Sequence, residues 1–239
     1  MKKLSLILVI FFSIISCKKD NATTSSGPPG PNSTIHPSND TAFYGFFTFS
    51  KWQNLSLNTT PSLSTNYSAN AYFTSTPQVY VHNTVIIGGV WLNNLALTCN
   101  PNNSFYSISV FHDSACVWQV LGQGVIPSFK YTSNNIKPQY TNYNLLPDTI
   151  DHTQNITLYF NIINADNLEI YISDSLHTVN HYIPVGVTSY TFPATLLAAL
   201  SSGTGSIRIA STNLDIENVY GKPMRFMFEY NFQKIIYIK

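Results

Sequence analysis

The sequence predicts an all-β protein with one or two antiparallel β-sandwich domains, of immunoglobulin-like or jelly-roll-like type, behind a disordered tether. Three observations support this fold class. Aromatic residues make up 14% of the 239 residues and recur with β-branched residues in short runs. Asn, Gly and Pro separate these runs, as in turns between strands. A single segment has a helical pattern, so a sandwich of short strands is favoured.

The chain begins with the features of an export signal. Lys2 and Lys3 precede an apolar run at residues 4–15, and Ser16 supplies the small residue that a signal peptidase requires. The apolar run is about a dozen residues long, which is too short for the ~20 residues of a membrane-spanning helix. Residues 1–16 are therefore predicted to be a signal peptide.

The end of this signal, residues 14–17 (Ile-Ile-Ser-Cys), resembles the lipobox of bacterial lipoproteins. In that family the cysteine, here Cys17, receives a diacylglycerol thioether, the chain is cut before it, and the new amino group is acylated. The resemblance implies a membrane partner reached through palmitate-type acyl chains. Each buried methylene contributes ~0.8 kcal/mol, so several chains together anchor a protein durably.

Residues 18–20 (Lys-Lys-Asp) resemble the charged start of Bacteroidota-type lipoproteins. The resemblance implies placement at the bacterial outer membrane, facing either the cell surface or the periplasm. No second apolar run approaches spanning length, so we expect the lipid to be the membrane attachment.

The rest of the chain divides by composition. Residues 17–41 are rich in Ser, Thr, Asn, Pro and Gly, which predicts a flexible lipidated tether. The apolar pattern lapses between residues 131 and 147. We therefore predict an N-terminal β domain at residues 42–135 and a C-terminal β-sandwich domain at residues 136–239. One large β domain is the alternative.

In the N-terminal part, the clearest local feature is a hairpin. Asn93 and Asn94 separate the apolar runs 90–92 and 95–97, and Asn tolerates the positive φ of a tight turn. Gly88 and Gly89 before it predict a bend or bulge. Other strands are predicted at residues 42–49, 72–73, 79–81, 105–111 and 116–120, and a polar stretch follows the first of them through residue 65. In the last strand, Cys116, Trp118 and Val120 share a face. Gly122 and Gly124 then turn the chain into residues 126–129.

In the C-terminal part, alternating patterns identify the strands. Leu168, Ile170 and Ile172 lie on one face of residues 168–172, and aromatic residues at positions 226, 228, 230 and 232 lie on one face of another strand. Residues 193–200 begin with Pro and end near Gly203, which predicts the one helix. The remaining strands are predicted at residues 157–162, 189–192, 207–209 and 235–238.

Residues 88–129 resemble a pattern of uncharacterised Bacteroidota lipoproteins. The matching residues are the hairpin at 90–95 (Val-Trp-Leu-Asn-Asn-Leu), then 118–122 (Trp-Gln-Val-Leu-Gly) and 126–129 (Ile-Pro-Ser-Phe). These motifs are structural, so the resemblance implies a fold and brings no catalytic residue.

Charge and cysteine content bound the function. Charged residues make up 10% of the chain, and four of the 12 basic residues lie in or just behind the signal. Without a basic face, we expect no nucleic-acid partner. Once Cys17 is lipidated, Cys99 and Cys116 remain. A disulfide between them and two free thiols are the alternatives.

Catalytic and metal-binding motifs are sparse. The sequence has no Gly-x-Ser-x-Gly elbow, no Gly-rich phosphate loop and no zinc-ligand spacing. We therefore predict no catalytic residue, no metal and no cofactor. The nearest metal-ligand candidates are His112 with Asp113, then Asp148, Asp151 and His152, and finally His177 with His181.

Two sets of residues are candidates for ligand binding or modification. Trp52 lies between polar residues and is predicted to be exposed for stacking on a sugar ring, whereas Trp91 and Trp118 are expected to fill cores. Four Asp-Ser/Thr-small-or-aliphatic triplets resemble the O-glycan acceptors of exported Bacteroidota proteins, which implies modification of Thr41, Ser114, Thr149 and Ser175. Turns capped by Asp are the alternative explanation of the triplets.

Taken together, these features predict a lipid-anchored envelope protein. We expect a binding or structural module at the outer membrane or cell surface, with a polysaccharide or another envelope protein as its partner. The alternatives are a carbohydrate-active enzyme with a loop-built site and an accessory subunit of a secretion or uptake complex.

Overall fold

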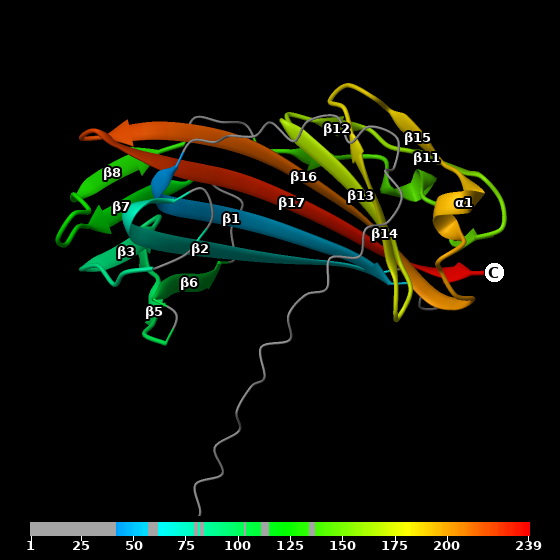
Figure 1. Cartoon of the computed structure of the whole chain (residues 1–239), viewed down its shortest axis with the longest axis horizontal. Coiled ribbons are helices and arrows are strands. Elements are labelled where there is room, and N and C mark those ends of the chain that lie inside the picture. The colour runs from blue at the N-terminus through cyan, green and yellow to red at the C-terminus, as the bar shows by residue number, and fades with distance from the viewer. Residues whose placement is uncertain are drawn as a thin grey trace, which may run out of the picture. The chain divides into compact units, whose positions relative to one another are not determined.

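A computed structural model describes residues 42–56, 62–78, 81, 84–102, 104–110, 115–133 and 137–239. These residues are almost entirely β-strand, with one short helix (Figure 1), which confirms the predicted fold class. The elements are β1 (Phe43–Ser56), β2 (Ser62–Gln78), β3 (Gly89–Leu92), β4 (Leu95–Ala96), β5 (Thr98–Asn100), β6 (Phe105–Val110), β7 (Val117–Leu121), β8 (Phe129–Thr132), β9 (Gln139–Tyr140), η1 (Tyr143–Leu145), β10 (Thr149–Ile150), β11 (Ile156–Tyr159), β12 (Ile162–Ile163), β13 (Asn167–Ser173), β14 (Thr178–Ile183), β15 (Ser189–Phe192), α1 (Ala194–Leu197), β16 (Gly203–Val219) and β17 (Lys222–Ile238).

The largest sheet has nine strands. Eight follow the order β14-β13-β16-β17-β1-β2-β6-β5, and β10 also pairs with β17. The pairs β1–β17 and β10–β17 are parallel, and the other pairs of this sheet are antiparallel. The sheet is therefore mixed, because the C-terminal hairpin β16–β17 lies beside the first strand of the fold.

Smaller sheets cover one face of this large sheet. They are the four-stranded sheet β4-β3-β7-β8 and the two-stranded pairs β11-β15 and β12-β9. Along β17 the even-numbered side chains from Met224 to Ile238 are buried. Met224, Phe226 and Phe228 belong to a first core with β3 and β7, whereas Tyr230, Phe232, Ile236 and Ile238 belong to a second core with β11, β15 and α1.

The two cores explain the composition change near residue 135. The first core draws on residues up to Ile126 and the second begins with Tyr140, but both use the same face of β17. Residues Asn39–Lys239 form one compact unit. In it, the N-terminal strand β1 pairs with the C-terminal strand β17, and β2 pairs with β1. The predicted boundary thus falls between two cores that share one sheet.

Several local predictions are confirmed. Asn93 and Asn94 form the turn between β3 and β4 with φ of 50° and 67°. The side chains of Cys116, Trp118 and Val120 are all buried, as are those of Leu168, Ile170 and Ile172. The helix α1 begins after Pro193 but is shorter than predicted, because the chain turns at Ala198.

Other predictions need correction. Most of the polar stretch predicted after residue 49 is strand, since β1 continues to Ser56 and β2 begins at Ser62; residues 57–61 lie outside the described residues. The strands predicted at 226–232 and 235–238 are one strand, β17. Trp118 lies in the first core, but Trp91 is half-buried on the outer face of β3 and packs over Gly89. Residues 79–80 of a predicted strand lie outside the described residues.

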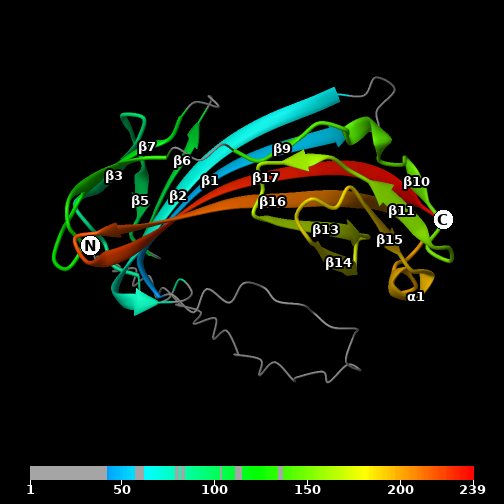
Figure 2. The ribbon, with the colours of Figure 1, turned by 90° about the horizontal axis from the view of Figure 1, so that it is seen from above.

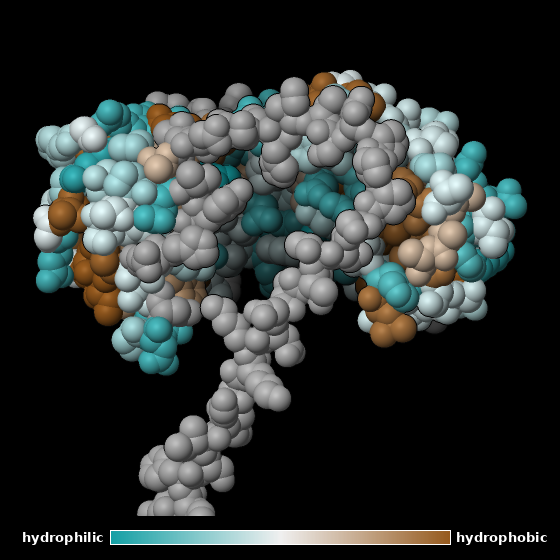
Figure 3. All heavy atoms as spheres, in the orientation of Figure 1, coloured by the Kyte–Doolittle hydropathy of each residue, from teal (hydrophilic) through white to brown (hydrophobic). Residues whose placement is uncertain are grey.

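The long strands bow along their length (Figure 2). The two cores lie on one side of them, and the opposite face, which we call the concave face, is recessed in its middle. Figure 3 shows this middle coloured largely hydrophilic. Its side chains come from the residues of β1, β13, β16 and β17 that alternate with the core residues.

Candidate functional site

The candidate site lies in the middle of the concave face and is built by strand register. Trp52 of β1 is the parallel partner of Asn231, which in turn is the antiparallel partner of Ala210. Ala210 is paired with Glu169 of β13. Paired residues project from the same face of a sheet, so one row of side chains runs from an indole to a carboxylate.

Asn231 is the unusual member of this row. Its side chain is fully buried, and among the described residues neither its Nδ2 nor its Oδ1 has a hydrogen-bond partner. A buried polar group without a partner costs roughly 1–3 kcal/mol. Such a cost is seldom carried without a reason, and it marks this row beside the indole as a candidate binding site.

The next row of the face contains a cation between two aromatic rings. The guanidinium carbon of Arg208 lies 3.9 Å from the centroid of Tyr171 and 5.8 Å from that of Trp52. Arg208 and Tyr171 are cross-strand partners, so the register explains the closer contact. Cation–π contacts of this kind hold the guanidinium plane in place while its N–H groups remain donors.

A hydrogen-bonded cluster forms the wall of the site on the β14 side. Glu169 accepts hydrogen bonds from the Tyr171 hydroxyl and from Nδ2 of Asn180, both at 2.5 Å. The Tyr182 hydroxyl donates to Oδ1 of Asn167. Burial, followed by the hydrogen bond to Glu169, raises the pKa of Tyr171 to about 12. Its hydroxyl is therefore protonated at neutral pH and acts as the donor.

A separate pocket lies on the opposite, core-bearing face, at the seam between the two cores. Its volume is about 240 Å³. The Lys137 ammonium lies 4.5 Å from the ring centroid of Phe49, and that of Lys51 lies 5.4 Å from the ring centroid of Tyr230. The pocket is lined by Phe49, Lys51, Ala115, Lys137, Pro138, Gln139, Phe228, Glu229 and Tyr230. It holds no paired carboxylates among these residues.

The structure gives different positions to the residues singled out in the sequence. Trp52, predicted to be exposed, is half-buried on the concave face, and its role in stacking on a sugar stays a prediction. No disulfide joins Cys99 and Cys116: Cys116 is buried in the first core and Cys99 packs against that core. Cys17, Thr41 and Ser114 lie outside the described residues.

Two of the predicted glycan acceptors are described. Thr149 is exposed in β10, and Ser175 is exposed in the turn after β13. Asp148, which precedes Thr149, makes an ion pair of 2.8 Å with the buried Lys234. The Asp174 carboxylate accepts backbone N–H groups around Ser175. Both aspartates therefore have structural partners, and modification of the hydroxyls stays a prediction.

The histidine and aspartate candidates for a metal site point to separate partners. His152 Nδ1 contacts the carbonyl of Lys239, whereas Asp151 accepts from the Thr153 hydroxyl at 2.6 Å. His177 faces Asp174, and the His181 ring stacks on Tyr190 at 3.9 Å. No group of three or more potential metal ligands gathers among the described residues, and His112 and Asp113 lie outside them.

No protein-family model and no curated protein matches the chain. Function must therefore be argued from the site. In the part of the chain that the structure describes, no helix has the length and apolar character to cross a membrane.

Sequence reasoning found Trp52 but missed Asn231 and Arg208. Asn231 is predicted on the face opposite the aromatic residues of β17, and that much is correct. Its lack of a partner has no sequence signal. Arg208 lies in a predicted strand, but its place between Trp52 and Tyr171 depends on three pairings among four strands.

Proposed function

We propose that the chain is a lipid-anchored binding module of the bacterial outer envelope, held through Cys17, whose concave face binds a polysaccharide. The observation that carries the proposal is the buried Asn231 amide without a partner beside the indole of Trp52. Trp52 supplies an aromatic ring for stacking on a sugar, and the half-buried Asn54 and Gln233 of the same face supply amides for its hydroxyl groups.

The shape and chemistry of the face favour binding over catalysis. A recessed surface of half-exposed aromatic and amide side chains suits an extended ligand, and it spans strands far longer than a small-molecule pocket needs. Rigid strands hold these side chains, so little ordering is required on binding. Export to the envelope, predicted from residues 1–20, would bring this face to polysaccharides.

Glycan binding is tested with the full chain and two variants. We expect wild-type protein to bind polysaccharides immobilised on a glycan array, and Trp52→Ala to weaken the same signals about tenfold or more, since stacking is lost. Asn231→Leu removes the amide at similar volume. It is expected to raise the midpoint of thermal unfolding, because the unpaired amide no longer has to be buried, and to weaken glycan binding through the changed packing beside Trp52.

The matched control is Trp91→Ala, which removes a half-buried indole from the outer face of β3, away from the concave face. We expect its glycan signals to equal those of the wild type. Absence of glycan binding by wild-type protein, or equal binding by Trp52→Ala, would contradict the proposal.

Anchoring is tested separately in cells. Radiolabelled palmitate should enter the wild-type chain and be absent from Cys17→Ser, which should leave the membrane fraction. A single acyl chain gives only reversible membrane binding, so stable fractionation with membranes requires the full set. Equal labelling of both proteins would remove the membrane attachment from the proposal and leave the glycan site to stand alone.

A further inference from the structure

We infer that the bound polysaccharide is acidic: a linear polymer carrying carboxylate or sulfate groups, which contacts Arg208 and Arg225 on the concave face. The inference rests on the proposed glycan-binding function and names its ligand class. It comes from two guanidinium groups on one face, neither of which has an acidic partner among the described residues.

Among the described residues, Arg208 is held by rings and not by a carboxylate. Its contacts are the Tyr171 ring at 3.9 Å and the Trp52 ring at 5.8 Å. A guanidinium has five N–H donors in a planar fork that matches a carboxylate or sulfate in two parallel hydrogen bonds. Because the stacking contacts fix the plane, a ligand anion meets a pre-oriented fork beside the indole that would hold its sugar ring.

Two acidic side chains of the concave face already accept hydrogen bonds. Glu169 of β13 accepts hydrogen bonds from Tyr171 and from Asn180, which lies on the neighbouring strand β14. Arg208 lies on β16, the neighbour on the other side of β13. Glu229 accepts the hydroxyl of Ser50 at 2.8 Å on the concave face. Neither carboxylate neutralises Arg208, so its charge remains available to a ligand.

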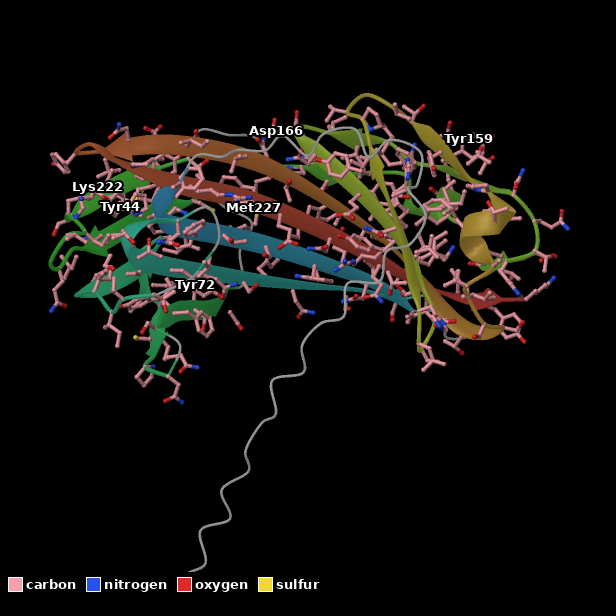
Figure 4. All side chains as sticks on the ribbon, in the orientation of Figure 1. Tyr44, Tyr72, Tyr159, Asp166, Lys222 and Met227 are labelled. Atoms are coloured by element: carbon pink, nitrogen blue, oxygen red, sulfur yellow. The ribbon has the colours of Figure 1, made fainter. Side chains whose placement is uncertain are left out.

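Arg225 provides the second cation toward the other end of the face. It pairs with Phe46 of β1, as Tyr72 of β2 does, so all three share the concave face. Its Nη2 lies 3.7 Å from the Met227 sulfur, and its Nε is buried with no partner. Met227 and Tyr72 are labelled in Figure 4. Burial lowers the pKa of Arg225, but a guanidinium stays protonated at neutral pH.

The separation of the two arginines indicates a polymer. Arg208 pairs with Gln233, which lies eight residues after Arg225 on β17 (233 − 225 = 8). At about 3.4 Å per residue, the two guanidinium groups are anchored about 27 Å apart along the strand. A single sugar cannot reach both, whereas an extended chain with repeated anionic groups lying along β17 can.

The test uses three polymers that differ in charge: polygalacturonate, dextran sulfate and uncharged dextran. We expect the full chain to bind one or both acidic polymers, more weakly as salt is raised, and to bind dextran at least tenfold more weakly. Arg208→Gln and Arg225→Gln should each weaken binding of the acidic polymer about tenfold. The tighter of the two acidic polymers identifies the anionic group as carboxylate or sulfate.

A matched control removes the same charge elsewhere. Lys130→Gln changes an exposed lysine of β8, on the four-stranded sheet, and should bind as the wild type does. Should Arg208→Gln lower the unfolding temperature, Arg208→Lys serves in its place, and the loss of the planar fork should still weaken binding.

The outcomes separate the inference from the proposed function. Equal binding of dextran and the acidic polymers, with both Gln variants like the wild type and Trp52→Ala weakened, would overturn the acidic ligand and leave the glycan site. If the wild-type chain binds none of the three polymers and no polysaccharide on the array, both fail. Loss of acidic-polymer binding in Lys130→Gln equal to that in Arg208→Gln would also overturn the inference, because it would show unspecific charge attraction.

Discussion

At the scale of single residues, Asp174 shows how one carboxylate organises a turn. Its Oδ1 accepts the backbone N–H of Leu176 at 2.6 Å and that of His177 at 2.5 Å, while its Oδ2 accepts the N–H of Ser201 at 2.6 Å. These three hydrogen bonds hold the pKa of Asp174 well below its usual value. The carboxylate joins the turn between β13 and β14 to the segment before β16, which explains why Asp occupies this position.

Asp174→Asn should therefore change the stability of the fold in a pH-dependent way. The pKa in the folded state is lower than the unfolded value of 3.8. The stability that the carboxylate contributes is thus fully present above pH 3.8 and is lost as pH falls toward the folded pKa. Urea midpoints of the two proteins should differ most at neutral pH and converge below about pH 4.

Glu217→Gln is the control for this measurement, because Glu217 is exposed on β16, away from the turn that Asp174 organises. Its urea midpoints should follow those of the wild type over the whole range. A constant gap between Asp174→Asn and wild type, from neutral pH down to pH 3, would contradict the role given to the carboxylate.

At the scale of elements, short-range signals were predictable and strand length was not. The Asn93–Asn94 turn, the alternation in β13 and the start of α1 after Pro193 follow from local backbone preferences. By contrast, β16 continues from the predicted residues 207–209 to Val219. Along this extension the positions that pair with the core side of β17 are polar, namely Ser211, Asn213 and Asp215. Hydrophobicity alone therefore gives no sign that the strand continues.

The candidate site itself was only partly predictable for a related reason. Trp52 could be found because its neighbours Lys51 and Gln53 are polar. Its meeting with Asn231 results from the parallel pairing of β1 with β17, and the nearby Ser50–Glu229 hydrogen bond joins residues 179 positions apart. No local pattern encodes a pairing at that separation, and the buried Asn231 without a partner becomes visible only when all neighbours are known.

At the scale of the whole described unit, two cores share one sheet. The 17-residue strand β17 contributes Phe226 to the first core and Phe232 to the second, both from one face. The hairpin partner β16 and the parallel neighbour β1 pair with it along the same length. Because this backbone ladder is continuous, disrupting either core should loosen strands that the other core needs.

The final prediction concerns this coupling. Phe226→Ala and Phe232→Ala remove rings that are 1% and 0% exposed, and each should cost roughly 3–5 kcal/mol of unfolding free energy. Urea unfolding is followed by far-UV circular dichroism for all strands and by tryptophan fluorescence, to which Trp118 of the first core contributes. If the two cores unfold together, Phe232→Ala shifts the midpoint of the fluorescence transition as far as that of the dichroism transition, although the ring lies in the second core.

Ile235→Ala, an exposed change on the same strand, should leave both midpoints nearly unchanged. A fluorescence midpoint that stays at the wild-type value in Phe232→Ala would show that the cores unfold independently.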